Sequence, residues 1–446
     1  MADSQHVGAL FTDLYEVTMA QAYWAEGQSD IAVFETFFRK LPRGRSYIMA
    51  AGLADVLDFL ETFSFDEDDL RYLRGAGVFS EEFLAWLSTV RFTGDVWAVP
   101  EGTVVFPNEP IVQVIAPIIE AQLVETFVLN QMHLQSVLAS KAARVVDAAR
   151  DRMVVDFGAR RAHGVDAALK VARTCYLAGA AGTSNLLAGR RYGIPTFGTM
   201  AHSFVQAYDN EFDAFEVFAR LYRGTTLLVD TYDTLRGVDH VIELARRWGD
   251  RFDVRAVRLD SGDLDQLSKA TRARLDAAGL HQVGIFVSSG LDEYEIAALV
   301  GDDCPIDGFG VGTKLVVAED APALDMAYKL VEYGGVGRTK LSSDKVIYPG
   351  RKQVYRRIDG GTFAGDTLGN PDDQLPGERL LVPVMKDGRR IPANDHGLEA
   401  ARVRAHQQIN ALGPQLRSLD DAGQPYPVEV SAAVMSELER LRRIRR

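Results

Sequence analysis

Helical and strand-like spacings of apolar residues alternate over the first 150 residues of the chain. Helical spacing predicts helices at 12–27, 49–63, 79–90 and 119–149. Short or alternating apolar runs predict strands at 31–38, 94–98, 102–107 and 110–115. Ser80 ahead of Glu81 and Glu82 is typical of a helix start and supports the third helix. This region is therefore expected to be mixed α and β.

After residue 150, short apolar runs that end in polar or glycine residues alternate with helical stretches. The runs span 153–157, 194–198, 226–230, 254–260, 284–290 and 307–312. Their ends lie roughly 20–40 residues apart, which is the length of one βα unit. Such alternation predicts a parallel sheet. Because the chain lacks a dinucleotide-binding fingerprint, a closed or nearly closed barrel is favoured over an open doubly wound sheet.

Strand and turn patterns return beyond residue 335, at 345–348 and 353–356, and the last forty residues are expected to be helical. The basic tail Arg442–Arg446 is interpreted as a solvated helix end. The fold expected is α/β, an irregular or incomplete (β/α) barrel with a mixed α/β N-terminal domain completed by C-terminal segments. The predicted limits are 1–118 for the N-terminal domain, 119–338 for the barrel and 339–446 for the segment that packs on the N-terminal domain.

Composition narrows the classes of partner. The chain has 446 residues, 47% of them hydrophobic, which suits one large domain and a smaller one. Its 49 Lys and Arg against 62 Asp and Glu give a net charge of -13, which disfavours nucleic acid but allows an anionic small substrate in a locally basic cleft. Cys175 and Cys304 fit no metal-ligand spacing, and no signal or membrane-spanning pattern is present. We therefore expect a cytoplasmic protein without membrane contact.

Polar clusters occur where the predicted βα strands end. They are 156–161, 198–203, 230–233, 258–263, 288–290 and 308–314. In a barrel the carboxyl ends of the strands form one face, and active sites are built on that face. All of these clusters are therefore expected to line one cleft.

The cluster around Gly310 and Gly312 is typical of a phosphate site. Glycines there leave backbone N–H groups free beside a helix start, and Thr313 and Lys314 follow directly. A glycine pair alone would more simply indicate a tight turn. The neighbouring hydroxyl and ammonium groups favour phosphate binding, as does the similar Ser289-Gly290 pair one strand earlier.

Charged residues at two other strand ends are candidate ligands for an anion. Arg258 and Asp260 lie two apart and so share a face of their strand; a structural ion pair is the competing interpretation. Arg160 and Arg161 offer bidentate recognition of a carboxylate or phosphate, and at least one is expected to face ligand.

His202 is the candidate for covalent or acid–base chemistry. A neutral imidazole between Thr199 and Ser203 at a strand end suits a nucleophile toward phosphorus or a general base, although histidines are more often structural. His163 ranks below it. Zinc, serine-hydrolase and P-loop motifs are absent from the sequence.

Taken together, these residues resemble the nicotinate phosphoribosyltransferases, which belong to the type II phosphoribosyltransferases. The resemblance rests on motifs spread along most of the chain, at 12–16, 38–42, 120–123, 156–164, 182–185, 198–203, 258–262, 308–313 and 349–353. It implies that nicotinate reacts with phosphoribosyl pyrophosphate to give nicotinate mononucleotide and pyrophosphate in NAD salvage. It also implies ATP hydrolysis, Mg²⁺ and a homodimer with shared active sites; no metal ligand is assigned.

The resemblance also implies roles for individual residues. His202 resembles the histidine that ATP phosphorylates, and Asp260 lies where positive charge grows on the ribose. Phe157 and a neighbouring subunit's Tyr15 resemble the pair that sandwiches the pyridine ring. Arg160 and Arg258 resemble the positive groups beside the pyridine carboxylate and the sugar phosphates, and Thr183 and Ser184 are implied to contact the substrate. The implied phosphate-binding residues are Ser289, Gly290, Gly310, Gly312 and Thr313, with Arg39 and Lys40 reaching pyrophosphate or ATP across the dimer.

Ser184 separates the acid-using branch from the amide-using one. Relatives that take nicotinamide carry an aspartate where Thr183 is here followed by Ser184. An aspartate would repel a substrate carboxylate, whereas a serine hydroxyl donates to it. The alternatives left open are a quinolinate or nicotinamide enzyme and a non-catalytic ligand-binding descendant.

Overall fold

The computed structural model describes residues 7–341, 346–392, 397–420 and 425–444. The chain folds into two compact units: unit 1, made of 1–137 and 323–446, and unit 2, made of 138–322. These limits differ from the domain limits expected at 118/119 and 338/339, for two reasons. The helix α6 (Glu125–Ala149) begins in unit 1, and β12 (Met326–Tyr333) pairs with the unit 1 strand β1 (Ile31–Phe38).

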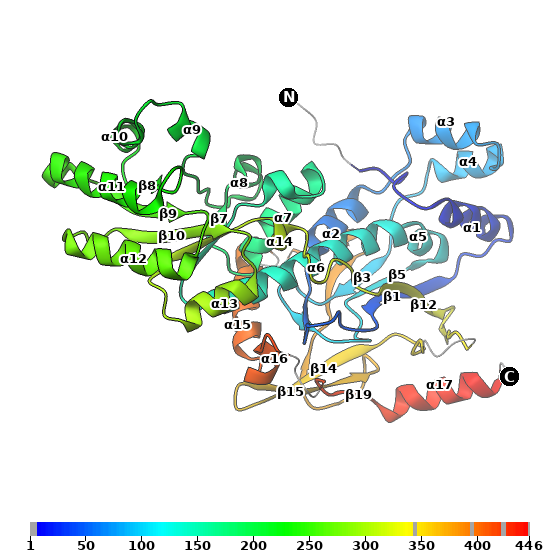
Figure 1. Cartoon of the computed structure of the whole chain (residues 1–446). Coiled ribbons are helices and arrows are strands. Elements are labelled where there is room, and N and C mark those ends of the chain that lie inside the picture. The colour runs from blue at the N-terminus through cyan, green and yellow to red at the C-terminus, as the bar shows by residue number, and fades with distance from the viewer. Residues whose placement is uncertain (1–6, 342–345, 393–396, 421–424, 445–446) are drawn as a thin grey trace. The chain divides into compact units, whose positions relative to one another are not determined.

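Unit 1 is built on a seven-stranded antiparallel sheet with the order β13-β12-β1-β5-β3-β17-β18 (Figure 1). Strand β1 spans the residues predicted from the sequence, because its alternating β-branched and aromatic residues suit a buried strand. The C-terminal segment contributes β17, so it completes the N-terminal fold as expected. The other strands are β3 (Asp95–Ala98), β5 (Val112–Pro117), β13 (Val336–Gly337), β17 (Val382–Lys386) and β18 (Arg389–Arg390).

The helices of the N-terminal part follow the prediction with three differences. The predicted helix at 49–63 starts later, because residues 48–49 form β2 (Ile48–Met49), which pairs with β4 (Val104–Val105). Helix α3 was not predicted, since Leu73 is its one buried residue. The long helix at 119–149 is interrupted where Thr12 donates to the Leu123 carbonyl. The observed helices are α1 (Leu14–Ala25), α2 (Leu53–Thr62), α3 (Glu67–Gly75), α4 (Glu81–Leu87), α5 (Ile118–Leu123) and α6.

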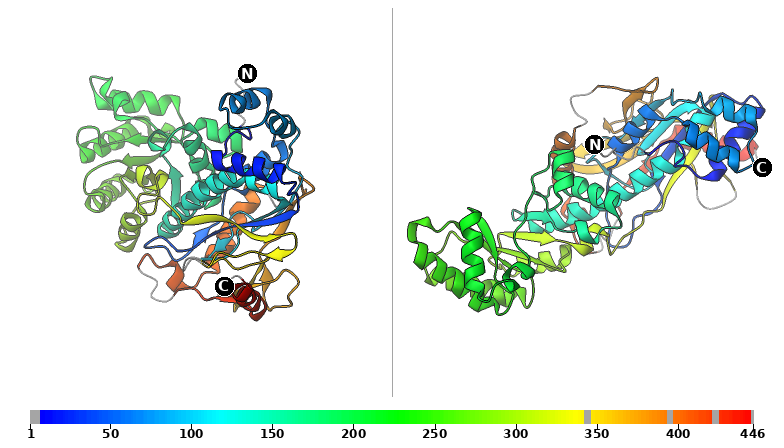
Figure 2. Two further views of the ribbon diagram at one scale, coloured as in Figure 1. Left: turned by 90° about the vertical axis from the view of Figure 1, so that its right-hand side faces the viewer. Right: turned by 90° about the horizontal axis from the view of Figure 1, so that it is seen from above.

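A second sheet in unit 1 is formed by the C-terminal segment alone. Its strand order is β16-β14-β15-β19. Helix α17 (Ala432–Ile444), which is the red helix at the C-terminal end of the chain in Figure 2, packs against β15. Lys345 of the strand expected at 345–348 lies outside the described residues, and 346–348 form no strand. The helical prediction for the last forty residues is wrong at β19, which adds to β15 in parallel. The remaining elements are β14 (Gln353–Asp359), β15 (Thr362–Gly369), β16 (Glu378–Arg379), β19 (Val428–Val430), α15 (Leu398–Asn410) and α16 (Pro414–Arg417).

Unit 2 is built on a six-stranded, wholly parallel sheet with the order β7-β6-β11-β10-β9-β8 (Figure 1). Strands β7 and β8 have no further partner strand among the described residues, so the sheet is an incomplete barrel, as predicted. The strands are β6 (Met153–Asp156), β7 (Gly182–Thr183), β8 (Thr225–Leu228), β9 (Val254–Leu259), β10 (Gly284–Ser289) and β11 (Gly308–Val311).

Helices follow the strands of unit 2 and lie against the sheet (Figure 1). Helix α7 contacts β7, α10 contacts β8, and α12 contacts β9 and β10. The helices and short turns are η1 (Ala159–Arg161), α7 (Val165–Leu177), α8 (Leu186–Tyr192), α9 (His202–Gln206), α10 (Glu211–Leu221), α11 (Thr234–Trp248), η2 (Gly249–Arg251), α12 (Leu264–Ala277), α13 (Glu293–Gly301) and α14 (Thr313–Val316).

The strand predicted at 194–198 is wrong. Only Thr196 forms a bridge there, to Thr183, and β7 takes the expected place in the sheet. Pro195 has no N–H to donate to a ladder, and its carbonyl oxygen would lie 2.1 Å from a Cβ at Gly182. The glycine therefore allows the two segments to approach without a regular strand.

The sheet of unit 2 has an apolar core that fixes its strand ends. Val257, Ile285, Val287, Phe309 and Val311 are fully buried. Burial of each such side chain contributes about 1.5–3 kcal/mol to folding. The polar residues that follow these strands are therefore held on a rigid support. In the described part of the chain, no helix is both long enough and apolar enough to cross a membrane.

Candidate active site

The carboxyl edge of the parallel sheet carries the polar clusters predicted from the sequence. Because the strands run in the same direction, their carboxyl ends meet at one edge. The residues at or just beyond these ends are Asp156, Ser184, Asp230, Asp260, Ser289 and Gly312. The predicted location of these clusters is therefore confirmed, except that the segment at 198–203 follows a loop rather than a strand.

Asp260 is held by both of its neighbouring strands. Its backbone N–H donates to Asp230 Oδ2 at 2.8 Å, and the Ser261 hydroxyl donates to the same oxygen at 2.8 Å. The Ser288 hydroxyl, on β10, donates to Asp260 Oδ1. The Asp260 side chain is still 37% exposed. A fixed and accessible carboxylate suits electrostatic stabilisation of a developing positive charge.

His202 is the first residue of α9 and faces this carboxylate. Its Nε2 lies 3.8 Å from Asp260 Oδ2, and its Nδ1 lies 3.2 Å from the Thr231 hydroxyl. The His202 side chain is 38% exposed, so it is not a core histidine. One ring nitrogen is thus anchored, and the other is directed toward the candidate site.

Arg258 joins the same group from β9. Its Nη1 donates to the Thr199 hydroxyl, and its Nη2 lies 4.0 Å from Asp260 Oδ1. Burial lowers the pKa of Arg258, Asp260 and Asp230 oppose that shift, and Arg160 adds to it. Its Nε is buried without a partner among the described residues. A guanidinium with an unused donor is suited to bind an anionic ligand.

Asp156 organises the turn that carries Ser184. Its carboxylate accepts from the Gly158 N–H at 2.8 Å and from the Thr183 hydroxyl at 2.7 Å, and burial raises its pKa. The Thr183 hydroxyl also accepts from the Asn185 N–H at 3.1 Å. Thr183 is therefore a buried support for Ser184, and its direct contact with substrate stays a prediction.

Arg160 and Ser184 line one hollow of unit 2. The hollow measures about 590 Å³, and Val165, Leu169 and Leu187 give it apolar walls. A concave apolar site with two polar anchors has the character of a small-molecule pocket. The sequence placed these two residues beside the same ligand, and the structure brings them together.

Phe157 lies beside this turn and over Gly310. Its ring centroid is 5.8 Å from that of Phe286, at an interplanar angle of 45°. A Cβ at Gly310 would come 2.5 Å from the Phe157 ring. Gly310 therefore has a packing function, which is to leave room for the aromatic ring. Its expected contact with phosphate stays a prediction.

Gly290 and Gly312 follow neighbouring strands at matching positions. Each comes one residue after the paired residues Ser289 and Val311. A Cβ at Gly290 would meet nothing within 4 Å, and one at Gly312 would meet only the Phe157 carbonyl oxygen at 3.9 Å. Packing does not require glycine at either position, which fits close approach of a ligand to the backbone.

The contacts of Lys314 differ from those expected of a phosphate ligand. Its Nζ lies 3.1 Å from Asp292 Oδ2 and 2.6 Å from Glu295 Oε1. The cation next to Thr313 is therefore engaged with two carboxylates of the neighbouring turn.

Tyr15 and Arg39 belong to unit 1. Tyr15 is 46% exposed. Burial raises its pKa, and a hydrogen bond to Glu125 adds to the shift. Arg39 Nη1 lies 3.1 Å from Asp325 Oδ1, and Lys40 is exposed. Their expected contacts with substrate across a dimer stay predictions.

The side chains at the sheet edge include donors that suit Mg²⁺, the metal that the family resemblance implies. No group of three or more His, Cys, Asp or Glu side chains suited to a metal occurs in the residues that the structure describes. Mg²⁺ needs only one or two protein carboxylates when substrate phosphates and water complete its shell. Asp260 and Asp230 meet that requirement, and Asp230 Oδ1 is buried without a hydrogen-bond partner among the described residues.

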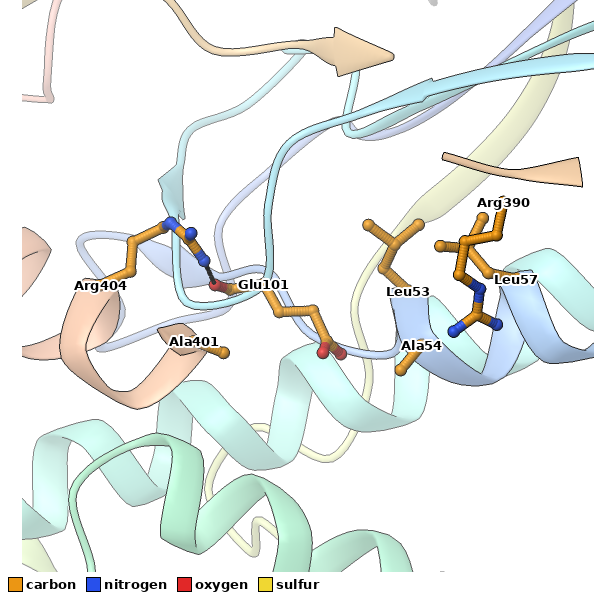
Figure 3. A pocket seen from close by; sticks show the side chains of 7 residues that line it. All are labelled: Leu53, Ala54, Leu57, Glu101, Arg390, Ala401 and Arg404. Carbon is orange, nitrogen blue, oxygen red and sulfur yellow. Dashed lines mark hydrogen bonds between the residues drawn. The ribbon is translucent and has the colours of Figure 1, made fainter. Parts of the chain in front are cut away.

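A second cavity, in unit 1, is too small for a substrate. It lies between α2 and α15, where Arg404 donates to the Glu101 carbonyl (Figure 3). Its volume of about 20 Å³ has room for about one water molecule. The larger hollow of unit 2 is therefore the better candidate.

Several residues that the structure places in the site have no role predicted from the sequence. They are Asp156, Thr199, Asp230, Thr231 and Ser288. All of them occur within or beside the polar clusters, but the sequence does not show which strands are neighbours. The order β8-β9-β10 is what brings Asp230 and Ser288 to Asp260.

Comparisons with known proteins identify the family of this chain. The model of the nicotinate phosphoribosyltransferase N-terminal domain matches residues 10–133, and that of the nicotinate phosphoribosyltransferase family matches residues 153–343. A nicotinate phosphoribosyltransferase of Mycobacterium tuberculosis is 77% identical over 442 residues, which are 99% of this chain and 96% of that protein. The nicotinate phosphoribosyltransferase of Bacillus subtilis is 44% identical over 383 residues, which are 84% of this chain and 78% of that protein.

A solved structure gives the same result. The crystal structure of human nicotinic acid phosphoribosyltransferase superposes with a TM-score of 0.85 at 28% identity, covering 96% of this chain and 99% of that one. The matches span both units and the residues of the sheet edge. This chain is a member of the nicotinate phosphoribosyltransferase family.

Proposed function

We propose that this protein catalyses the reaction of nicotinate with phosphoribosyl pyrophosphate to give nicotinate mononucleotide and pyrophosphate, coupled to ATP hydrolysis, in NAD salvage. The pyridine nitrogen donates its lone pair to C1′ of the ribose, and the bond from C1′ to the pyrophosphate oxygen breaks. The observation that carries the proposal is the position of Asp260, 3.8 Å from His202 and 4.0 Å from Arg258, in a chain of this family.

Phe157, Arg160 and Ser184 would hold the pyridine acid. The Phe157 ring offers an aromatic face, while Arg160 and Ser184 line the adjacent hollow and suit a carboxylate. Tyr15 of a second subunit would cover the opposite face of the ring. We therefore include a homodimer with shared sites in the proposal.

Asp260 would stabilise the positive charge that develops on the ribose as pyrophosphate leaves. A carboxylate fixed by the bonds to Asp230 and Ser288 needs no reorganisation when that charge appears. Mg²⁺ held by Asp260 and Asp230 would neutralise charge on the pyrophosphate. Arg258, which lies beside Asp260, would bind the anionic groups of the substrate.

His202 would couple transfer to ATP. Because Thr231 engages Nδ1, Nε2 is the nitrogen available for phosphorylation. A bond from Nε2 to the γ-phosphorus would form as the bond to the ADP oxygen breaks, and hydrolysis of phosphohistidine would release phosphate. The overall activity is thus of the ATP-dependent ligase type.

Nicotinate is preferred over the other pyridines because of Ser184. The Ser184 hydroxyl and Arg160 line the same hollow and together suit a substrate with one carboxylate. The amide of nicotinamide would be bound better by a hydrogen-bond acceptor at this position, and the second carboxylate of quinolinate would need further cations. A non-catalytic descendant is disfavoured, because His202, Asp260 and the glycines are all present. Since ATP and phosphoribosyl pyrophosphate are intracellular metabolites, we propose a cytoplasmic location without nucleic-acid or membrane partners.

A direct assay compares three pyridines. The purified protein is incubated with phosphoribosyl pyrophosphate, Mg²⁺ and ATP, together with nicotinate, nicotinamide or quinolinate, and mononucleotide is measured by chromatography. We expect product with nicotinate and at least about tenfold lower kcat/KM with the other two, which corresponds to about 1.4 kcal/mol of discrimination. Failure to form any mononucleotide would refute the proposal.

A further inference from the structure

Lys314 links two turns that the sequence predicts to bind the phosphate of the phosphoribosyl substrate. Strands β10 and β11 are parallel neighbours, with Ser289 paired to Val311. The turns that follow contain Gly290 and Gly312. Lys314, after the second turn, contacts Asp292 at the end of the first turn at 3.1 Å. The side chain of one turn therefore ties it to the other.

The carboxylates that Lys314 contacts are already fixed by α13. Asp292 accepts from the Tyr294 N–H at 2.8 Å and the Glu295 N–H at 3.1 Å, while Glu295 accepts from the Asp292 N–H at 2.9 Å. This reciprocal capping box stabilises the helix start. It also places two negative charges within five residues of Gly290.

Asp292 and Lys314 stabilise each other's charged forms. Burial alone would raise the pKa of Asp292, but its hydrogen bonds to Glu295, Lys314 and Tyr294 outweigh burial and lower it. Burial alone would lower the pKa of Lys314, and the two carboxylates reverse that shift and raise it. One ammonium thus faces two carboxylates, and its side chain is only 26% exposed.

We propose that Lys314 is a positioning residue that joins the two phosphate-binding turns and neutralises Asp292 and Glu295, and so sets the affinity for the phosphate of the phosphoribosyl substrate without touching it. The proposal rests on the proposed function. Without the ammonium, the carboxylates would repel an incoming phosphate, and the turns would lose their connection. A direct phosphate ligand and an ordinary surface ion pair are the two competing roles.

Four variants separate these roles: Lys314→Met, Lys314→Arg, Glu295→Gln and the double variant Lys314→Met/Glu295→Gln. For Lys314→Met we expect KM for phosphoribosyl pyrophosphate to rise about tenfold, with kcat and KM for nicotinate within about twofold of the parent. Lys314→Arg should keep the parent KM, because a guanidinium also bridges two carboxylates. The matched control is Lys269→Met, which removes an exposed ammonium 2.5 Å from Asp265 and should change neither KM.

The double variant distinguishes neutralisation from direct contact. If Lys314 acts by neutralising the carboxylates, removing the Glu295 charge should recover at least about threefold of the lost affinity. If Lys314 itself bound phosphate, the double variant would be no better than Lys314→Met, and the proposal would be overturned. An unchanged KM in Lys314→Met, or a parallel loss of kcat, both KM values and melting temperature, would overturn it too.

Calorimetry with inorganic phosphate separates this proposal from the proposed function. Suppose that the parent protein makes no mononucleotide but binds phosphate, and that Lys314→Met weakens that binding about tenfold. The proposed reaction is then wrong, whereas the proposed role of Lys314 is supported. If the parent protein neither makes mononucleotide nor binds phosphate, both proposals fail.

Discussion

The backbone N–H of Asp260 donates to the carboxylate of Asp230 at 2.8 Å, so two neighbouring strand ends of the parallel sheet are joined at the residue that faces His202. Asp230 thus holds the backbone of Asp260, while the Asp260 side chain stays partly exposed. The sheet order therefore sets the position of the Asp260 carboxylate, which is the proposed catalytic group.

Asp230→Asn tests the Mg²⁺-binding role proposed for this carboxylate. The amide oxygen can still accept from Asp260 and Ser261, but the second carboxylate proposed for Mg²⁺ is lost. We expect kcat to fall about 10- to 100-fold and the Mg²⁺ concentration for half-maximal activity to rise. Initial rates across a Mg²⁺ titration measure both. Equal kcat and Mg²⁺ dependence in parent and variant would contradict the Mg²⁺-binding role of Asp230.

Ser184→Asp tests selection of the acid. A carboxylate in the hollow that Arg160 lines would repel nicotinate and accept from an amide NH₂. The expected result is a KM for nicotinate at least about tenfold higher, with a gain for nicotinamide. Ser184→Ala is the control, since it removes the hydroxyl without adding charge and should have a smaller effect. Unchanged nicotinate kinetics in Ser184→Asp would show that Ser184 does not select the acid substrate.

Two glycine variants should affect different substrates. In Gly310→Ala the new methyl group would come 2.5 Å from the Phe157 ring, so the ring must shift and KM for nicotinate should rise. In Gly290→Ala the methyl group enters open space, so stability is retained while KM for phosphoribosyl pyrophosphate rises. Separate KM values for the two substrates check this. The same KM changes in both variants would argue against separate subsites.

Glu109 gives a pH-dependent prediction in unit 1. Burial raises its pKa well above 4.5, and the neighbouring Asp366 adds to the shift. Between pH 4.5 and the pKa of Glu109 in the folded protein, the folded state therefore binds more protons than the unfolded state. The contribution of this carboxyl group to stability consequently declines as the pH rises through that range. In Glu109→Gln that decline should disappear, because the amide that replaces the carboxyl does not titrate. Urea unfolding from pH 5 to pH 8 measures the slope.

The control for Glu109→Gln is Asp366→Asn. Arg356 is buried and lies 2.6 Å from Asp366 Oδ2, so this change leaves a buried cation poorly paired and should cost about 3–5 kcal/mol. Loss of stability of similar size in both variants would show that the Glu109 charge is needed and would contradict the prediction.

The sequence predicted what depends on local pattern. Strand β1 and the strands from β8 to β11 follow apolar runs, and the site lies at their carboxyl ends because parallel order requires it. The strand expected at 194–198 was wrong because Pro195 and the glycine opposite it favour a single bridge. Residue pattern shows neither close backbone approach nor strand order, so the support of Asp260 by Asp230 and Ser288 was not predicted.

The engagement of Lys314 was missed for a similar reason. Its position after Gly312 and Thr313 suggested a phosphate ligand, whereas Asp292 and Glu295 lie about twenty residues earlier and reach it only through the pairing of β10 with β11. The resemblance to the family supplied the identity of the substrates, which the pattern alone does not give.

In the proposed reaction, His202 couples transfer to nicotinate to ATP hydrolysis. The most direct measurement follows mononucleotide, ADP and acid-labile phosphate on the protein together, in the parent and in His202→Ala. We expect ADP to form with each mononucleotide and labile phosphate to appear on the parent alone. His202→Ala should still transfer the phosphoribosyl group, but with no gain from ATP. Labile phosphate on the variant, or an equal stimulation of both proteins by ATP, would contradict the coupling role of His202.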